Sequence, residues 1–313
     1  MTIPGVLPVP TSGVFPIAPT PFFDDESIDY DGAVRIVDYL VDAGVDGFCI
    51  LANYSEQFSL TDSERSRLQE LTMRQNAGRV PIIVTTSHFS ARIAAERSRA
   101  AQSEGASMVM VMPPYHGATL RASEAEIEAF FSTIAEAIDI PIMIQDAPMS
   151  GTTLTASFLA KLAAIIPNVS FVKIESAQSA AKLSTLIRLG GSSIEGPFDG
   201  EESITLIPDL EAGATGTMPS AMIPDVLGEI VRLWLAGDRE KATSLWEFWL
   251  PMIHFENRQC GLQATKILMA KGGIIASAAT RAPLSRVSPA IREGLIAHAR
   301  RRDPLILRWS SSR

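Results

Sequence analysis

Lys173 and Glu175 lie two residues apart in a short apolar stretch, and together they could perform carbonyl and proton-transfer chemistry. Residues 169–174 read Val-Ser-Phe-Val-Lys-Ile, which is typical of a buried β-strand. Side chains alternate along a strand, so both residues are expected on one face, about 7 Å apart along the chain. An amine with a lowered pKa can attack a ketone to form an imine, and a neighbouring carboxylate can move protons. The alternative is a lysine at a strand end in an ordinary ion pair with Glu175.

The rest of the chain must position this stretch, and its pattern alternates between strand-like and helix-like segments. Strands are expected at residues 14–20, 47–51, 81–85, 106–112, 141–144, 169–174, 193–195 and 213–218. Helices are expected after the capping box that begins at Thr61, after Met222, and at residues 31–43, 90–104, 123–138, 156–165, 177–189 and 200–211. Eight alternating units in roughly 240 residues predict an α/β fold, a (β/α)8 TIM barrel. A doubly wound sheet is the rival, but no G-x-G-x-x-G follows the first strand.

The end of the chain is expected to be purely helical, at residues 239–255, 257–271 and 289–301. We therefore predict a barrel over residues 1–237 and a C-terminal helical extension over residues 238–313 that packs on the barrel.

Composition excludes several classes of function. The 313-residue chain has a net charge of −8 and no basic cluster before residues 300–302, so nucleic acid is not expected as a partner. The four histidines are scattered without metal-ligand spacing, and no metal site is expected. Two cysteines make no disulfide framework, which suggests a reducing compartment. Without an evident signal peptide or spanning stretch, we expect a cytoplasmic protein with no membrane contact.

In such barrels the chemistry lies at the carboxyl ends of the strands. The segments expected there contain Asn53-Tyr54-Ser55-Glu56, Tyr115-His116, Gln145-Asp146, Lys173-Ile174-Glu175 and Gly196-Pro197-Phe198-Asp199. Lys173 is the only lysine in these segments. This placement favours a catalytic role for Lys173 over an ordinary ion pair.

Several longer motifs resemble the family of N-acetylneuraminate lyase and dihydrodipicolinate synthase. The matching stretches are GVFPIAPTPF, ILANYSEQFSLTDSER, VMPPYHG, PIMIQDAP and FVKIES. The resemblance covers nearly the whole chain and places Lys173 where the family carries its imine-forming lysine. It implies a (β/α)8 enzyme that acts on a small 2-keto acid through a covalent imine, with no other cofactor. It also implies a homo-oligomer, a tetramer in this family.

The departures from the family pattern concern the proton relay. This chain has Asn53-Tyr54-Ser55 where the family usually has Gly-Thr-Thr or Gly-Ser-Thr, and His116 where the family has a second tyrosine. Gln145 stands where the family has its catalytic tyrosine. The synthase's substrate-binding arginine is absent from residues 147–151. The missing tyrosine relay is compatible with dehydration and awkward for an aldol condensation.

A narrower set of motifs resembles the branch of this family that dehydrates 2-keto-3-deoxy sugar acids: ILANYSEQF, VTTSH, PPYHGAT, QDAP, KIE, EGPFDGEE and ENRQ. That resemblance implies conversion of L-2-keto-3-deoxyarabonate to 2,5-dioxopentanoate and water. Lys173 would form the imine and Glu175 would transfer protons. An aldolase that releases pyruvate and a non-catalytic barrel that binds a sugar acid are the alternatives.

The predicted substrate-binding residues are Asn53, Tyr54, Ser55, Tyr115, His116, Gln145 and Gly196. The resemblance suggests that Ser55 and neighbouring backbone N–H groups hold the substrate carboxylate, and the alternative for Ser55 is a turn residue. Tyr115 and His116 are expected in the pocket, across a dimer contact, or in loop packing.

Overall fold

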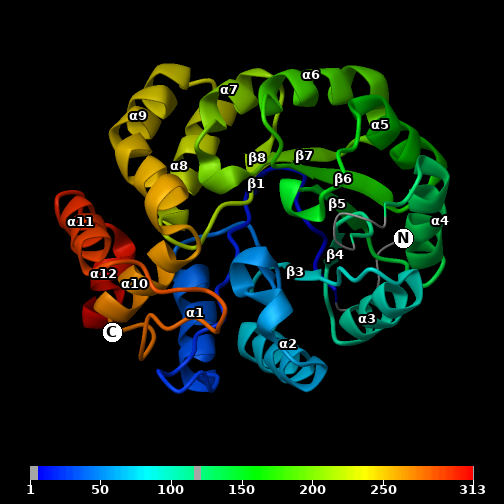
Figure 1. Ribbon diagram of the computed structural model, residues 1–313. Helices are drawn as coiled ribbons and strands as arrows, with labels where there is room; N and C mark the ends of the chain where they lie inside the picture. The colour runs from blue at the N-terminus through cyan, green and yellow to red at the C-terminus, as the bar shows by residue number, and fades with distance from the viewer. Residues whose placement is uncertain (1–5, 116–120, 313) are drawn as a thin grey trace. The chain divides into compact units, whose positions relative to one another are not determined.

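The computed structural model describes residues 6–115 and 121–312, in which strands alternate with helices (Figure 1). The strands are β1 (Gly13–Val14), β2 (Phe48–Ile50), β3 (Ile82–Thr85), β4 (Met108–Val111), β5 (Ile142–Asp146), β6 (Val169–Ile174), β7 (Gly196–Asp199) and β8 (Gly216–Thr217). The helices that follow them in turn are α1 (Tyr30–Asp42), α2 (Asp62–Asn76), α3 (Ala91–Ser103), α4 (Glu124–Ala135), α5 (Ala156–Ile165), α6 (Ser179–Gly190), α7 (Leu206–Glu211) and α8 (Pro224–Leu235). The α-helices after α8 in the described chain are α9 (Arg239–Phe255), α10 (Gln263–Lys271), α11 (Pro289–Arg300) and α12 (Leu305–Arg308).

The eight strands form one sheet in the order β1-β8-β7-β6-β5-β4-β3-β2. From β2 to β8 each strand neighbours the next one in the chain, and β1 neighbours β8, which is the arrangement of a barrel rather than of a doubly wound sheet. Beyond β1, Ile17 forms parallel bridges to Cys49, which lies in β2, and to Ser220, which follows β8. The predicted (β/α)8 barrel fold with C-terminal helices is confirmed.

The register of the parallel strands brings the predicted chemistry to one level. Lys173 on β6 lies opposite Gln145 on β5 and opposite Phe198 on β7. Ile174, the next residue, lies opposite Asp146 and Asp199. Because directly paired residues on parallel strands point to the same face, Lys173 and Gln145 share one face and Asp199 lies on the other.

The chain divides into two compact units. The first comprises Met1–Gly13, Pro81–Glu201 and Thr205–Met218, and the second comprises Val14–Val80, Glu202–Ile204 and Pro219–Arg313. Strands β3 to β8 belong to the first unit, while β2, α1, α2 and α8 to α12 belong to the second. The division after residue 237 stays a prediction.

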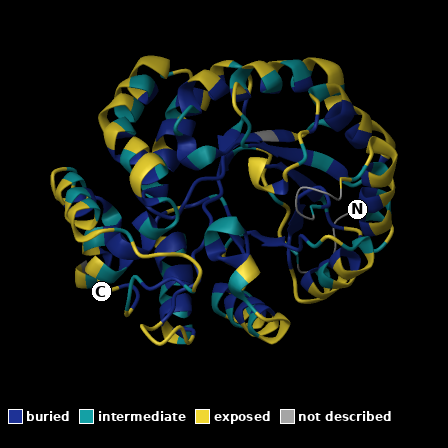
Figure 2. Ribbon diagram, viewed as in Figure 1, coloured by how far each residue is buried: buried dark blue, intermediate teal, exposed yellow. Residues whose placement is uncertain are grey.

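The core of the first unit is its parallel sheet, whose strands are built from β-branched and other apolar side chains. Val109, Ile144 and Val172 are completely buried, as expected for strands covered on both faces. Figure 2 shows these strands as buried, while α3 to α6 expose their outer faces. The helices therefore bury the sheet and leave only the strand ends for chemistry.

The second unit is organised around the apolar face of α1. Ile36, Val37 and Leu40 are buried on this helix, and Asp29 caps its first turn by accepting from the Gly32 N–H at 2.7 Å. The chain end packs on the same helix, because the Trp309 indole N–H donates to Asp42 at 2.8 Å.

Several predicted segments were wrong in their boundaries. The first strand, predicted at 14–20, is only Gly13–Val14, and the last, predicted at 213–218, is Gly216–Thr217. The predicted strand at 193–195 overlaps a 3₁₀ turn, η4 (Gly191–Ser193), and the strand is instead Gly196–Asp199. The predicted helix at 200–211 begins only at Leu206, because residues 201–203 form η5 with positive φ angles of 47°, 58° and 68°. The predicted helix at 257–271 is split, since η6 (Glu256–Cys260) is a π-helical turn that ends at Gly261 with φ of 55°. Left-handed backbone cannot continue a right-handed helix.

Candidate active site

Lys173 is the penultimate residue of β6, and its side chain is only 5% exposed. Its ammonium group forms an ion pair with the carboxylate of Glu175, which directly follows the strand. The Glu175 backbone N–H donates to the Asp146 carbonyl at 3.0 Å, which extends the pairing between β5 and β6. The ion pair confirms that the two side chains share one face. A buried amine therefore has a proton acceptor in direct contact.

Gln145 completes this group from the neighbouring strand. Its Nε2 donates to both oxygens of Glu175 at 3.3 Å, so the amide orients the carboxylate. The Gln145 side chain is almost fully buried, and its Oε1 has no hydrogen-bond partner among the described residues. An unsatisfied buried carbonyl oxygen costs about 1–3 kcal/mol. A donor on a bound ligand would remove that cost.

Gly200 adjoins the candidate site, although the sequence analysis did not single it out. A Cβ atom placed on Gly200 would lie 2.5 Å from Glu175 Cγ and 3.2 Å from Lys173 Cε. The backbone after β7 therefore touches both members of the ion pair, and only glycine leaves room for them. Both glycines stand in the motif EGPFDGEE, and the predicted strand at 193–195 placed Gly196, rather than Gly200, directly after the strand.

Gly196 lies at the start of β7, opposite Phe171 rather than Lys173. A Cβ there would lie 2.9 Å from the Phe171 ring. The expectation that residues 196–199 follow the strand was wrong, because these residues are the strand. Gly200 occupies the position that was predicted for Gly196.

Behind the Lys173 face lies a buried polar cluster around Asp199. Its Oδ2 accepts from the Thr217 hydroxyl at 2.6 Å. Burial is the main cause that raises the pKa of Asp199 well above its ordinary value, and a hydrogen bond with Asp209 is the second cause. Asp209 in turn accepts from Ser179 at 2.8 Å. These hydrogen bonds link the carboxyl end of β7 to β8 and, through Asp209, to α7 and α6.

Asp146 lies on the same face of the sheet as Asp199, and its carboxylate also has hydrogen-bond partners in the first unit. Its Oδ2 accepts from Lys182 Nζ at 2.5 Å and from the Ser176 hydroxyl at 3.2 Å. Lys182 lies on α6, outside the strand ends that carry the predicted chemistry. It serves to tie this helix to β5.

The predicted carboxylate-binding turn is found in the second unit as η1 (Asn53–Ser55). The Ser55 hydroxyl donates to the Ala18 carbonyl at 2.6 Å and accepts from the Ala52 N–H at 3.1 Å. Asn53 accepts from the side chain of Gln57 at 2.6 Å. These two hydrogen bonds of the Ser55 hydroxyl shape the turn, and its role toward a substrate carboxylate stays a prediction.

Tyr115 is partly exposed and is the last residue before the gap in the described chain. His116 lies outside the described residues. Within residues 6–115 and 121–312, no group of three or more His, Cys, Asp or Glu side chains could hold a metal ion. None of the described helices is long and apolar enough to cross a membrane.

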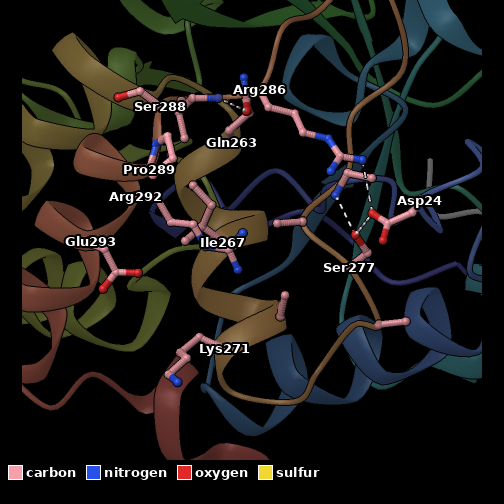
Figure 3. A pocket seen from close by; sticks show the side chains of 15 residues that line it. Asp24, Gln263, Ile267, Lys271, Ser277, Arg286, Ser288, Pro289, Arg292 and Glu293 are labelled. Atoms are coloured by element: carbon pink, nitrogen blue, oxygen red, sulfur yellow. Dashed lines mark hydrogen bonds and ion pairs between the residues drawn. The ribbon is translucent and has the colours of Figure 1, made fainter.

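A large hollow of 960 Å³ lies in the second unit beside α10 (Figure 3). On its wall Asp24 accepts from the Ser277 hydroxyl at 2.8 Å and from Arg286 at 3.1 Å. None of the predicted site residues lines this hollow. Size alone therefore does not mark the candidate active site.

The fold and the site define a (β/α)8 barrel with a buried lysine–glutamate pair at the carboxyl end of its sixth strand. Residues 10–301 match the dihydrodipicolinate synthetase family, and the chain belongs to this family, as predicted.

The relatives of this chain include enzymes of two kinds. L-2-keto-3-deoxyarabonate dehydratase of Azospirillum brasilense is 52% identical over 298 residues, which are 95% of this chain and 96% of the relative. 4-Hydroxy-tetrahydrodipicolinate synthase of Thermomicrobium roseum is 30% identical over 91% of this chain and 92% of its own length. The crystal structure of dihydrodipicolinate synthase from Rhodopseudomonas palustris superposes with a TM-score of 0.85 at 27% identity, covering 95% of this chain and 99% of that one.

Proposed function

We propose that this protein is a hydro-lyase that converts L-2-keto-3-deoxyarabonate to 2,5-dioxopentanoate and water through an imine on Lys173. The observation that carries the substrate is the 52% identity, over nearly the full length of both chains, to a dehydratase named for it. The chemistry is supported by the buried ion pair of Lys173 with Glu175.

The reaction begins with a proton transfer inside that ion pair. Glu175 accepts a proton from the Lys173 ammonium, and the neutral amine attacks the C2 ketone. Glu175 returns that proton to the C2 oxygen, which leaves as water, so a cationic imine forms and Glu175 is again a carboxylate. The imine acidifies the C3–H bond because the electron pair can flow to nitrogen. Glu175 is proposed to remove the C3 proton and to return it to the C4 hydroxyl, which leaves as water while a C3–C4 double bond forms. Movement of a proton from C5 to C3 gives the enol of the C5 aldehyde, with its double bond between C4 and C5. This enol takes up a proton at C4 and loses its hydroxyl proton to become the aldehyde, and hydrolysis of the imine releases 2,5-dioxopentanoate and regenerates the Lys173 amine.

Gln145 is proposed to contact both Glu175 and the substrate. Its amide N–H groups hold both Glu175 oxygens, so the base keeps one orientation. Its unsatisfied Oε1 is proposed to accept from a hydroxyl of the substrate. A tyrosine at this position could donate a proton to a second carbonyl partner, whereas an amide cannot act as an acid. This difference supports dehydration over aldol chemistry.

Further residues are proposed to take part in substrate binding. Asn53, Tyr54, Tyr115, His116 and Gly196 are proposed to line the pocket, and Gly200 to lie beside the reacting pair. The turn that contains Ser55 is proposed to hold the carboxylate of the 2-keto acid. A homo-oligomer, a tetramer by family resemblance, and a cytoplasmic location are also proposed. Both cysteines are buried thiols, which fits a reducing compartment.

Product analysis on L-2-keto-3-deoxyarabonate tests the proposal. We expect 2,5-dioxopentanoate, detected as the aldehyde and by its mass. Release of pyruvate would identify the aldolase alternative instead. Binding of the sugar acid without any turnover would identify the non-catalytic barrel.

A further inference from the structure

A second lysine–glutamate pair lies in the second unit and is sealed from solvent. Lys266 on α10 pairs with Glu56, and both side chains are 0% exposed. Lys266 Nζ also donates to the Ala279 carbonyl at 2.9 Å and lies 4.4 Å from the centre of the Phe22 ring. The second Glu56 oxygen accepts from the Arg281 backbone N–H at 3.0 Å. Every charge of this pair is thus met by a specific partner.

Arg281 forms further contacts with the residues that follow Glu56 in the chain. Its guanidinium group donates to the Ser59 carbonyl at 2.7 Å and to both oxygens of Glu64, at 2.8 and 2.6 Å. It also lies 4.6 Å from the centre of the Phe22 ring. Residues 56–64 are therefore held by two cations that come from the C-terminal part of the chain.

Glu56 occupies a strained position between two single turns. It follows η1 (Asn53–Ser55), precedes η2 (Gln57–Ser59), and has a φ angle of 56°. A non-glycine residue keeps this left-handed conformation only when its surroundings hold it there. The Lys266 ammonium and the Arg281 N–H grip the Glu56 side chain from the two carboxylate oxygens, which supplies that hold.

Stability alone is a weak explanation for such a pair. Removing two charges from water is so unfavourable that a well-packed apolar pair is often at least as stable as a buried ion pair. What the pair provides beyond an apolar contact is one defined position for the Glu56 backbone.

We propose that Lys266 is a positioning residue that, through Glu56, holds the 53–55 turn in the shape needed to bind the substrate carboxylate. This inference rests on the proposed function, which assigns that turn to the 2-keto acid. It predicts that loss of the pair weakens ligand binding and leaves the chemistry at Lys173 intact.

The first test measures imine formation rather than turnover. Parent protein, Lys266→Met and the double variant Glu56→Gln/Lys266→Met are treated with pyruvate and borohydride, and labelling of Lys173 is quantified by mass spectrometry. We expect both variants to reach full labelling, at pyruvate concentrations about tenfold higher than the parent, as for loss of uniform binding. The double variant guards against misfolding, because it removes both buried charges together. Lys161→Met, which breaks an exposed ion pair with Glu128, is the matched control.

A second measurement does not depend on the proposed function. Hydrogen exchange at the amides of Ser55, Glu56 and Gln57 should be faster in the double variant, while exchange in the strands stays at the parent rate. Each of these amides donates within the turn. Parent-like half-saturation and parent-like exchange in the double variant would overturn the positioning role. Absence of labelling in the parent would instead overturn the proposed imine chemistry, and the exchange result would still decide whether Lys266 holds the turn.

Discussion

The two buried lysine–glutamate pairs of this protein are built in opposite ways. Lys173 and Glu175 are two residues apart at the end of one strand, and Glu175 keeps 15% of its side chain exposed. Lys266 and Glu56 are 210 residues apart, and neither is exposed. The first pair is accompanied by an unsatisfied amide oxygen of Gln145, whereas the second is saturated by a carbonyl and a backbone N–H.

From this difference we expect Lys266 to be the less reactive amine, although its pKa is lowered. Burial lowers the pKa of Lys266 to about 8 although the Glu56 carboxylate raises it, so much of the amine is neutral at mildly alkaline pH. Yet Lys266 has no exposed surface through which a ketone could reach it. Lys173 lies at a strand end beside a partly open carboxylate, where proton transfer and ligand approach can coincide.

Substitution of Lys173 should have the largest effect on turnover. Lys173→Met should lower turnover by on the order of 10⁴-fold or more, because no other group replaces a covalent nucleophile. Lys173→Arg should fail equally, since guanidinium stays protonated. Borohydride labelling should vanish in both and persist in Lys266→Met. Labelling at Lys266 in the parent protein would reverse the assignment of the two pairs.

The carboxylate of the first pair is tested by Glu175→Gln. Turnover should fall by about 10²–10⁴-fold, the usual contribution of a positioned general base. Exchange of the substrate C3 protons with deuterated water should fall in parallel, as measured by NMR, while imine trapping survives. If C3 exchange continues at the parent rate, the base lies elsewhere.

For stability the order of the effects should be reversed, so that substitution of Lys266 destabilises the fold more than substitution of Lys173. Lys266→Met leaves Glu56 as a buried uncompensated charge, so the free energy of unfolding should fall by about 3–5 kcal/mol. Lys173→Met should be milder, because Glu175 is partly exposed and keeps the Gln145 amide. Urea unfolding followed by circular dichroism compares the two variants. Equal losses would mean that the two pairs are equally sealed.

Gly200→Ala tests how closely the first pair is packed. The added methyl group would collide with Glu175 Cγ and the Ile174 carbonyl. We expect kcat to fall by up to about 10²-fold, as for a misplacement near 1 Å. Gly294→Ala on α11, where a Cβ would meet only the Phe255 ring at 3.0 Å, is the matched control. Parent-like kcat in Gly200→Ala would show that the backbone can move aside.

The smallest effect concerns the Glu64 end of the second pair's network. Hydrogen bonds from Arg281 lower the pKa of Glu64 from 4.5 to about 2. Below pH 4.5 the unfolded chain binds a proton that the folded chain does not, so this contribution to stability is lost as the pH falls toward 2. Glu64→Gln should therefore show a flatter decline of thermal stability between pH 4.5 and pH 2. A parallel decline in both proteins would mean that other carboxylates govern that range.

The sequence was informative where the chemistry is local. The alternation of strands and helices predicted the barrel, and the spacing of Lys173 and Glu175 predicted their shared face because strand periodicity depends on the backbone alone. The capping box at Thr61 was also predicted, and the Glu64 N–H does donate to the Thr61 hydroxyl at 3.2 Å.

Predictions failed where backbone conformation depends on distant partners. Residues 201–203 carry polar side chains that suit a helix start, yet they are left-handed, and the Trp246 indole donates to the Ser203 carbonyl at 3.0 Å from α9. Gly196 and Gly200 look alike in the sequence. Only the register of β7 against Phe171 and Lys173 assigns one to packing and the other to the site.

By itself, then, the sequence determined the alternation of strands and helices and the placement of Lys173 and Glu175 on one face of a strand end, because short-range periodicity and residue chemistry specify them. Tertiary structure alone decided that Lys266 finds Glu56, that Gln145 holds Glu175, and that Gly200 lies against the ion pair. The physical reason is that these contacts join segments far apart in the chain. Their partners are selected by packing and by the need to satisfy buried charges, which no local pattern encodes.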